Sequence, residues 1–196
     1  MESELFNPQI ENYVISWEER EGSTKGVNAL IQLNDFTKIG RIETEGIIYK
    51  KISMFDIDNS VVLIANKKIG WTTTRFELKD SDGIEIGRAI MKNNLFIRTN
   101  KSDFIMVNPK DEKILTVKYP SRLVGVNEIN TFDGKNVAKF EVKYELIKTD
   151  FWRSYDTHTC YLQFSKPDFD RKILWGFLIS YISSFFNDIY KPDGAG

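Results

Sequence analysis

The stretch Ile173–Phe186, ILWGFLISYISSFF, is the one long apolar run of the chain, and it lies close to the C-terminus behind the charged residues Asp170–Lys172. A helix that spans a bilayer needs about 20 apolar residues, whereas a run of about 10–14 is more often a helix buried in a protein core. A helix that is apolar all round must be enclosed by other parts of the protein. The sequence therefore predicts a buried helix, which we place at residues 170–190.

The chain before this helix has the pattern of short strands joined by tight turns. Residues 76–79 alternate apolar and polar side chains, and Asp80–Gly83 then supplies a turn, because glycine tolerates a positive φ. The pattern recurs 28 residues later, from Phe104 to Ile114, and more loosely from Ile129 to Val137. We interpret these copies as generic hairpins, with a duplication as the alternative. A turn every 8–12 residues or so predicts a β-sandwich or a β-barrel.

The composition is that of an ordinary globular protein. Hydrophobic residues make up 41% and charged residues 28% of the 196 positions, so one domain is the default expectation. The net charge of −1 is uneven: residues 1–21 carry six acids and one base, which leaves +4 on the rest of the chain. This excess is too small to predict a nucleic-acid partner, but it suits an anionic membrane surface if the bases share one face.

The sequence divides into three predicted segments. Residues 1–26 are expected to form an acidic, partly ordered N-terminal extension, residues 27–191 the folded domain with its core helix, and residues 192–196 a disordered tail. The single cysteine, Cys160, allows no internal disulfide and indicates a reducing compartment. Because the N-terminus has no apolar signal region, we expect a cytoplasmic protein that can associate peripherally with a membrane.

The stretch Tyr155–Ile173 contains a Leu162-Gln163-Phe164 strand and runs into the apolar helix. This order, together with the hairpin pattern of Phe76–Gly87, resembles the superfamily of phospholipid scramblases, tubby C-terminal domains and LURP-one-related proteins. In scramblases a similar Ile-Gln-Phe-Pro-like strand precedes a hydrophobic C-terminal helix, and the superfamily repeats a hairpin unit of this kind. The resemblance covers roughly residues 45–190 of this chain.

The resemblance implies a mainly β (α+β) fold, a closed antiparallel β-barrel of about twelve strands around a central hydrophobic C-terminal helix. It also implies a non-catalytic domain that binds anionic phospholipid headgroups at a membrane surface, as tubby proteins bind phosphoinositides. Scramblases respond to calcium through an acidic segment, which here matches Asp156–Cys160 and supplies one carboxylate and two hydroxyls. Because calcium takes about six to eight oxygen ligands, Asp156 is a weak calcium candidate, and we expect no metal and no other cofactor.

Basic residues of the central region are the candidates for binding lipid headgroups: Lys50, Lys51, Lys67, Lys68, Lys92 and Arg98. Near an anionic membrane each base contributes about 1 kcal/mol. The alternative is that they are solvated turn residues or gatekeepers of sheet edges. Trp71, Trp152 and Trp175 could anchor a protein at a membrane interface, but we expect Trp71 to pack at a barrel corner and Trp175 to lie in the core.

Two other functions are open to the sequence. The first is a protein-interaction scaffold without a lipid role, whose N-terminal extension docks a partner. The second is a hydrolase that uses His158 and Cys160, which alternation places on one face of a strand. No spacing fixes an orienting acid for this pair, and a lone cysteine is most often a small hydrophobic residue. The chain also lacks a phosphate-binding glycine loop and zinc-ligand spacing, so we expect no enzyme.

Overall fold

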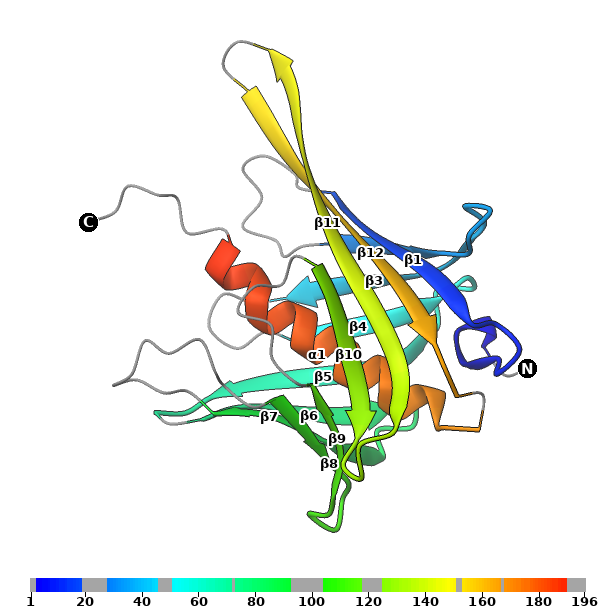
Figure 1. Ribbon diagram of the computed structural model, residues 1–196, viewed down its shortest axis with the longest axis vertical. Coiled ribbons are helices and arrows are strands. Elements are labelled where there is room, and N and C mark those ends of the chain that lie inside the picture. Colours follow the sequence, from blue (N-terminus) through cyan, green and yellow to red (C-terminus); the bar gives the residue numbers. More distant parts are fainter. Residues whose placement is uncertain are drawn as a thin grey trace.

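Twelve antiparallel strands close into one barrel in the computed structural model of the chain, and a single helix runs through it (Figure 1). Each strand pairs with its neighbours in sequence, and β12 closes the barrel by pairing with β1. The structure describes residues 3–18, 28–45, 51–71, 73–92, 104–117, 125–150, 153–166 and 168–189. The predicted twelve-stranded closed barrel with its helix is confirmed.

The elements follow one another in chain order. A short 3-10 helix, η1 (Glu4–Phe6), comes first, and the helix α1 (Arg171–Ile189) comes last. The strands between them are β1 (Asn12–Glu18), β2 (Asn28–Gln32), β3 (Lys38–Glu45), β4 (Lys51–Asp56), β5 (Val61–Ile69), β6 (Thr73–Asp80), β7 (Glu85–Lys92), β8 (Phe104–Val107), β9 (Lys113–Val117), β10 (Gly125–Thr131), β11 (Asn136–Asp150) and β12 (Arg153–Phe164).

Five hairpin turns share one pattern of backbone hydrogen bonds. They begin at Leu33, Asp56, Asp80, Asn108 and Thr131. In the β6–β7 turn the Asp80 carboxylate accepts the backbone N–H of Asp82 at 3.0 Å and that of Ile84 at 2.9 Å, while Gly83 has a φ of +78°. Each turn is accompanied by a bulge in its strand pair. The two copies predicted 28 residues apart are therefore the same structural unit, which occurs five times among the residues that the structure describes.

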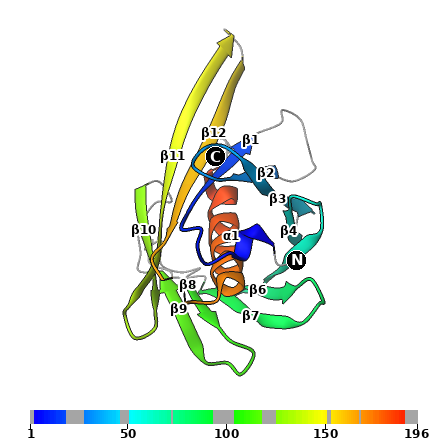
Figure 2. The same ribbon diagram turned by 90° about the vertical axis from the view of Figure 1, so that its right-hand side faces the viewer.

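The helix α1 lies along the barrel axis with strands on its sides (Figure 2). Its apolar residues from Leu174 to Ile182 are buried. The Tyr181 ring makes edge-to-face contacts with Phe104 and Phe140, at centroid distances of 5.2 and 5.3 Å. Gly176 brings the helix close to Leu78 of β6. The prediction that the apolar run forms an enclosed helix is confirmed, and no helix among the described residues is long and apolar enough to cross a membrane.

The N-terminal end of α1 is fixed by polar contacts. The Asp170 carboxylate accepts the backbone N–H of Lys172 at 2.8 Å and so caps the helix. Buried Arg171 stacks its guanidinium on Phe164, 4.2 Å from the ring centroid, and donates to the Pro8 carbonyl. Trp175 Nε1 donates to the carbonyl of Leu5 in η1 at 2.8 Å. The start of the chain and its final helix therefore hold one end of the barrel together.

The predicted boundary between an extension at residues 1–26 and a barrel at residues 27–191 is wrong. The barrel already includes β1, and Leu5 and Phe6 of η1 are buried. The physical reason is the alternation in β1, where Tyr13, Ile15 and Trp17 all point into the core. Because acidic residues flank this strand, the alternation of its apolar residues was not recognised in the sequence. Residues 19–27 and the predicted tail at 192–196 lie outside the described residues.

Replacing Gly176 by valine should lower the free energy of unfolding by about 1–3 kcal/mol, since overpacking a filled core strains it. A Cβ atom at this position would lie 2.8 Å from Leu78 Cδ1. Urea unfolding followed by circular dichroism measures the change. The double variant Gly176→Val/Leu78→Ala should lose less stability than the sum of the two single losses, because the smaller side chain removes the clash. Equal stability of Gly176→Val and the parent would contradict the placement of α1 against β6.

Candidate functional site

The structure describes the side chains of three of the six basic residues that the sequence nominated. Lys51 and Lys68 are exposed, at the start of β4 and near the end of β5. Lys67 is only 6% exposed. Lys92 ends β7 at the position opposite Thr73, and its side chain is outside the description. Lys50 and Arg98 lie outside the described residues.

Lys67 cannot take part in an outer patch, so this candidate is corrected. Leu63 and Ala65 are buried on the inner face of β5, and Lys67 follows in the same alternation. Its ammonium lies 5.6 Å from the centroid of the Phe76 ring, a cation–π contact inside the barrel. Neighbouring residues of a strand point to opposite faces, so Lys67 and Lys68 could not both face the outside.

The outer faces of four adjacent strands, β4 to β7, carry a group of cations that we call the basic face. Its members are Lys51, Lys68, Arg75, Lys79 and Arg88. The acids among them are Glu77 and Glu85. Strand β6 contributes most, because Arg75, Glu77 and Lys79 alternate with the buried Phe76 and Leu78. Lys51 is at the margin of the face, opposite Glu45 of β3.

The strand register brings like charges together on this face. Lys68 of β5 lies directly opposite Arg75 of β6, a position in which side chains stand about 5 Å apart at Cβ and like charges destabilise the pair. Lys79 lies two pleats farther along β6, about 13 Å from Arg75. The ion pair between Lys68 and Glu77 offsets part of this repulsion, while Arg75 and Lys79 keep an excess of positive charge on the face.

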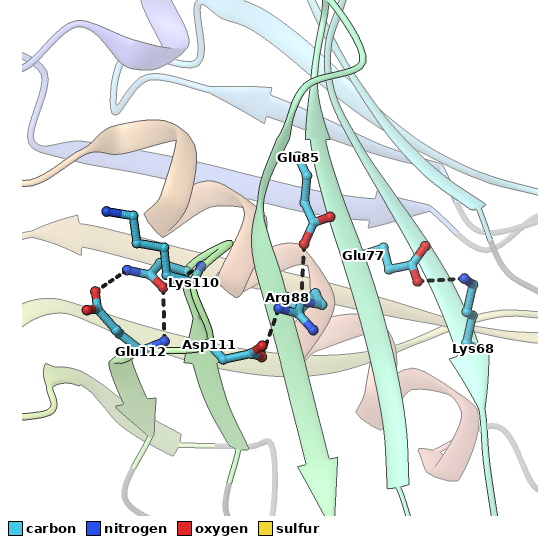
Figure 3. Close-up of polar contacts among 8 residues, drawn as sticks. Lys68, Glu77, Glu85, Arg88, Lys110, Asp111 and Glu112 are labelled. Carbon is cyan, nitrogen blue, oxygen red and sulfur yellow. Dashed lines mark hydrogen bonds and ion pairs between the residues drawn. The ribbon is translucent and has the colours of Figure 1, made fainter.

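Two of the five cations already have acidic partners (Figure 3). Lys68 Nζ lies 2.5 Å from Glu77 Oε1. Arg88 Nη2 lies 2.8 Å from Asp111 Oδ1, and its Nε is 3.1 Å from Glu85 Oε1 without hydrogen-bond alignment. The other three members, Lys51, Arg75 and Lys79, have no ion pair or hydrogen bond within the part of the chain that the structure describes. The side chains of this group are therefore available to an anion.

The gatekeeper alternative does not apply to the basic face. Lysines protect exposed sheet edges from pairing with other chains, but a closed barrel has no edge. Strands β5, β6 and β7 are each paired on both sides. The remaining alternative is an ordinary solvated surface, which a binding experiment can distinguish from a site.

Sequence reasoning missed Arg75, Lys79 and Arg88. It selected bases by their density along the chain, which favoured the pair at positions 67 and 68. The signal that would have found Arg75 and Lys79 is the alternation of residues 75–79, which places every second residue on one face. Lys68 lies beside these residues only because the register of β5 against β6 places it opposite Arg75. Arg88 lies on the same face because the register of β6 against β7 places it opposite Glu77.

The residues weighed for calcium binding and for hydrolysis lie on β12. Asp156 is opposite Leu146, and His158 is opposite Trp17 and Tyr144, but the side chains of Asp156 and His158 are outside the description. Cys160 is fully buried, and burial raises the pKa of its thiol far above its usual range. Among the described residues there is no group of three potential metal ligands.

Trp71 lies in the β5–β6 turn, and its prediction as a packed corner residue is wrong. The side chain is 90% exposed. The physical reason is that the packed core ends before this turn. Ile69, the last residue of β5, is already half exposed, and Trp71 lies two residues beyond it. Trp175, by contrast, is buried in the core as predicted. Trp152 lies outside the described residues.

Comparison with known proteins identifies no similar protein. No family model matches the chain, and no curated protein or solved structure matches it either. The resemblance to the scramblase and tubby superfamily therefore stays a prediction.

Replacing Lys67 by glutamate should lower the free energy of unfolding by about 3 kcal/mol, because it buries a carboxylate against the negative face of the Phe76 ring. The matched change Lys68→Glu alters an exposed ion pair on the outer face and should cost about 1 kcal/mol or less. Urea unfolding of both variants measures the difference. Similar losses in the two variants would show that Lys67 is not an interior residue.

The native protein should resist a thiol-specific reagent at about pH 8, because burial both raises the pKa of Cys160 and blocks access to its sulfur. Labelling should become fast when the chain is unfolded in urea, and this unfolded sample is the control. Absorbance of the released chromophore follows the reaction. Complete labelling of the folded protein within minutes would instead favour the hydrolase alternative.

Proposed function

We propose that this protein is a non-catalytic, scramblase-like or tubby-like domain that binds anionic phospholipid headgroups at a membrane surface, with the basic face as its binding site. The observation that carries the proposal is the grouping of Arg75 and Lys79, which have no partner among the described residues, with Lys68 directly opposite Arg75. These side chains stand on a closed, rigid wall. The ligand that fits them is an oxyanion such as a phosphate.

The expected mechanism is electrostatic. The Arg75 guanidinium can bind two phosphate oxygens at once, whereas Lys68 and Lys79 act as compact point charges. Lys68 already forms an ion pair with Glu77, so a phosphate would have to compete with the Glu77 carboxylate for the Lys68 ammonium. This exposed ion pair itself contributes little to stability. Binding should weaken as salt is added, because exposed charges are screened within about 8 Å at physiological ionic strength.

The barrel and its helix have a supporting role in this proposal. The core made by α1 and the inner faces of the strands fixes the backbone of β5, β6 and β7, and the outer side chains take their spacing from it. Because α1 is enclosed, the proposal assigns it no contact with lipid. Lipid transfer between leaflets is not part of the proposed function for the same reason.

The alternative function, a protein-interaction scaffold, has one observation in its favour. A shallow hollow of about 710 Å³ lies beside the start of α1, with Ile114, Phe132, Phe169 and Ile173 among its lining residues. Phe132 is 55% exposed there. A hollow of this kind could hold an apolar side chain of a partner. Within the segment 1–26 that the sequence analysis gave a docking role, residues 12–18 are a strand of the barrel.

The test is flotation with vesicles of neutral phosphatidylcholine, with and without about one lipid in three replaced by phosphatidylserine or a phosphoinositide. The parent protein should bind only the anionic vesicles, and less so in high salt. The variant Arg75→Glu/Lys79→Glu should bind more than about tenfold more weakly, because each base near the surface contributes about 1 kcal/mol.

The matched control is Lys139→Glu/Lys143→Glu, which makes the same change of charge on exposed residues of β11, across the barrel from β6. It should weaken binding by less than about threefold, through long-range attraction alone. Equal losses in the two double variants would remove the basic face as the site. Absence of binding by the parent protein, together with capture of a protein ligand at the hollow near Phe132, would favour the scaffold.

A further inference from the structure

The tip of the β5–β6 hairpin exposes two large apolar side chains. The Gly70 N–H donates to the Thr73 carbonyl at 2.8 Å and closes the turn, and Trp71 at the tip is almost fully exposed. Ile69, the last residue of β5, is 52% exposed. Its predecessors Leu63 and Ala65 on the same face are buried, so the hairpin extends past the packed core at this end.

The apolar tip is continuous with the basic face. Ile69 lies opposite Thr74, and the next pair along the hairpin is Lys68 opposite Arg75. At about 3.3 Å per residue, the cationic pair is within about 10 Å of Trp71 along the strand. The hairpin therefore has an apolar end followed by a pair of positive charges. In a bilayer the acyl chains likewise lie deeper than the phosphates, so the apolar end matches the deeper layer and the charges match the phosphates.

We propose that the β5–β6 hairpin is the membrane-inserting element of this protein, with Trp71 and Ile69 entering the interfacial layer of an anionic bilayer and Lys68 and Arg75 contacting its phosphates. This inference rests on the proposed function and names the depth and orientation of binding. Tryptophan concentrates at the level of the headgroups because its ring is apolar and its N–H is polar. Stable association commonly combines an apolar insertion with a basic patch, as this hairpin does.

The charges beside the other exposed apolar side chains favour this tip over them. At the opposite end of the barrel, Ile57 lies between Asp56 and Asp58, and Ile84 directly precedes Glu85. Phe132 is followed by Asp133 but also has the Lys113 ammonium 5.1 Å from its ring centroid, so its surroundings are of mixed charge. Carboxylates next to an apolar side chain are repelled by an anionic surface, whereas Lys68 and Arg75 are attracted to it. The β5–β6 hairpin is thus the apolar tip with the complementary charge.

The hairpin also fixes how the barrel would stand on the membrane. The helix α1 begins beside η1 at one end of the barrel, and β5 runs toward the other end, where α1 terminates (Figure 1). Insertion of the tip would turn the last turns of α1 toward the bilayer and leave the five tight hairpins in water. The barrel itself would stay outside the hydrocarbon.

The experiment uses the full chain and phosphatidylcholine vesicles with about one-third phosphatidylserine, some carrying a bromine or nitroxide quencher at a shallow acyl position. Tryptophan fluorescence of the parent should be quenched on binding, and Trp71→Phe should remove most of the quenched signal. Trp71→Ser should weaken vesicle binding about tenfold, the loss expected for one large apolar side chain. Because Trp71 is exposed, its replacement should leave the thermal unfolding midpoint unchanged.

The matched control is Ile84→Ser, which removes an exposed apolar side chain, 61% accessible, from a turn at the opposite end of the barrel; its vesicle affinity should equal that of the parent. Normal binding of Trp71→Ser to anionic vesicles, with no quenching of Trp71 in the parent, would overturn the insertion and leave the proposed function standing. Absence of parent binding to anionic vesicles would overturn both. Equal binding and quenching on neutral vesicles would support the insertion but contradict the role of the basic face.

Discussion

The enclosure of α1 by the twelve strands is the constraint on which the rest of the structure depends. The apolar run of this helix has to be shielded from water, and the inner faces of the strands supply the shield. Small details follow from the same constraint. Gly176 lets the helix approach Leu78, and Trp175 finds its hydrogen-bond acceptor at Leu5 instead of in solvent. The outer faces of the strands are thereby left to other uses.

Strand β6 shows how one alternation serves both core and surface. Phe76 and Leu78 face the helix, while Arg75 and Lys79 face outward. The inner residues hold the strand in place, and the outer residues inherit a fixed spacing from it. At the tip of the same hairpin Trp71 is exposed. Charge and apolar area therefore meet on neighbouring parts of a rigid scaffold, which is the basis of the proposed attachment to anionic lipid.

The parts of this structure that the sequence predicted are those that depend on short stretches of neighbouring residues. Ile173–Phe186 predicted the enclosed helix, and the Asp80–Gly83 turn predicted the hairpins, because both depend on neighbouring residues alone. The strand β1 was missed because the surrounding acids outweighed its alternation. The meeting of Lys68 with Arg75 depends on the register of β5 against β6, which runs without a bulge from the turn that Gly70 and Thr73 close. This turn has no Asp-x-x-Gly pattern like that of residues 80–83, so the sequence did not mark it as a hairpin.

The order of elements also has a consequence for how the chain reaches its fold. Closure of the barrel requires β1, early in the chain, to pair with β12. The helix α1, which fills the inside of the barrel, follows all twelve strands in the sequence. During synthesis on the ribosome the early strands would thus emerge with their inner faces uncovered, long before α1 is available to cover them. Such dependence on contacts between distant parts of the chain is typical of slow folding, and uncovered apolar faces are prone to aggregation until the core is complete.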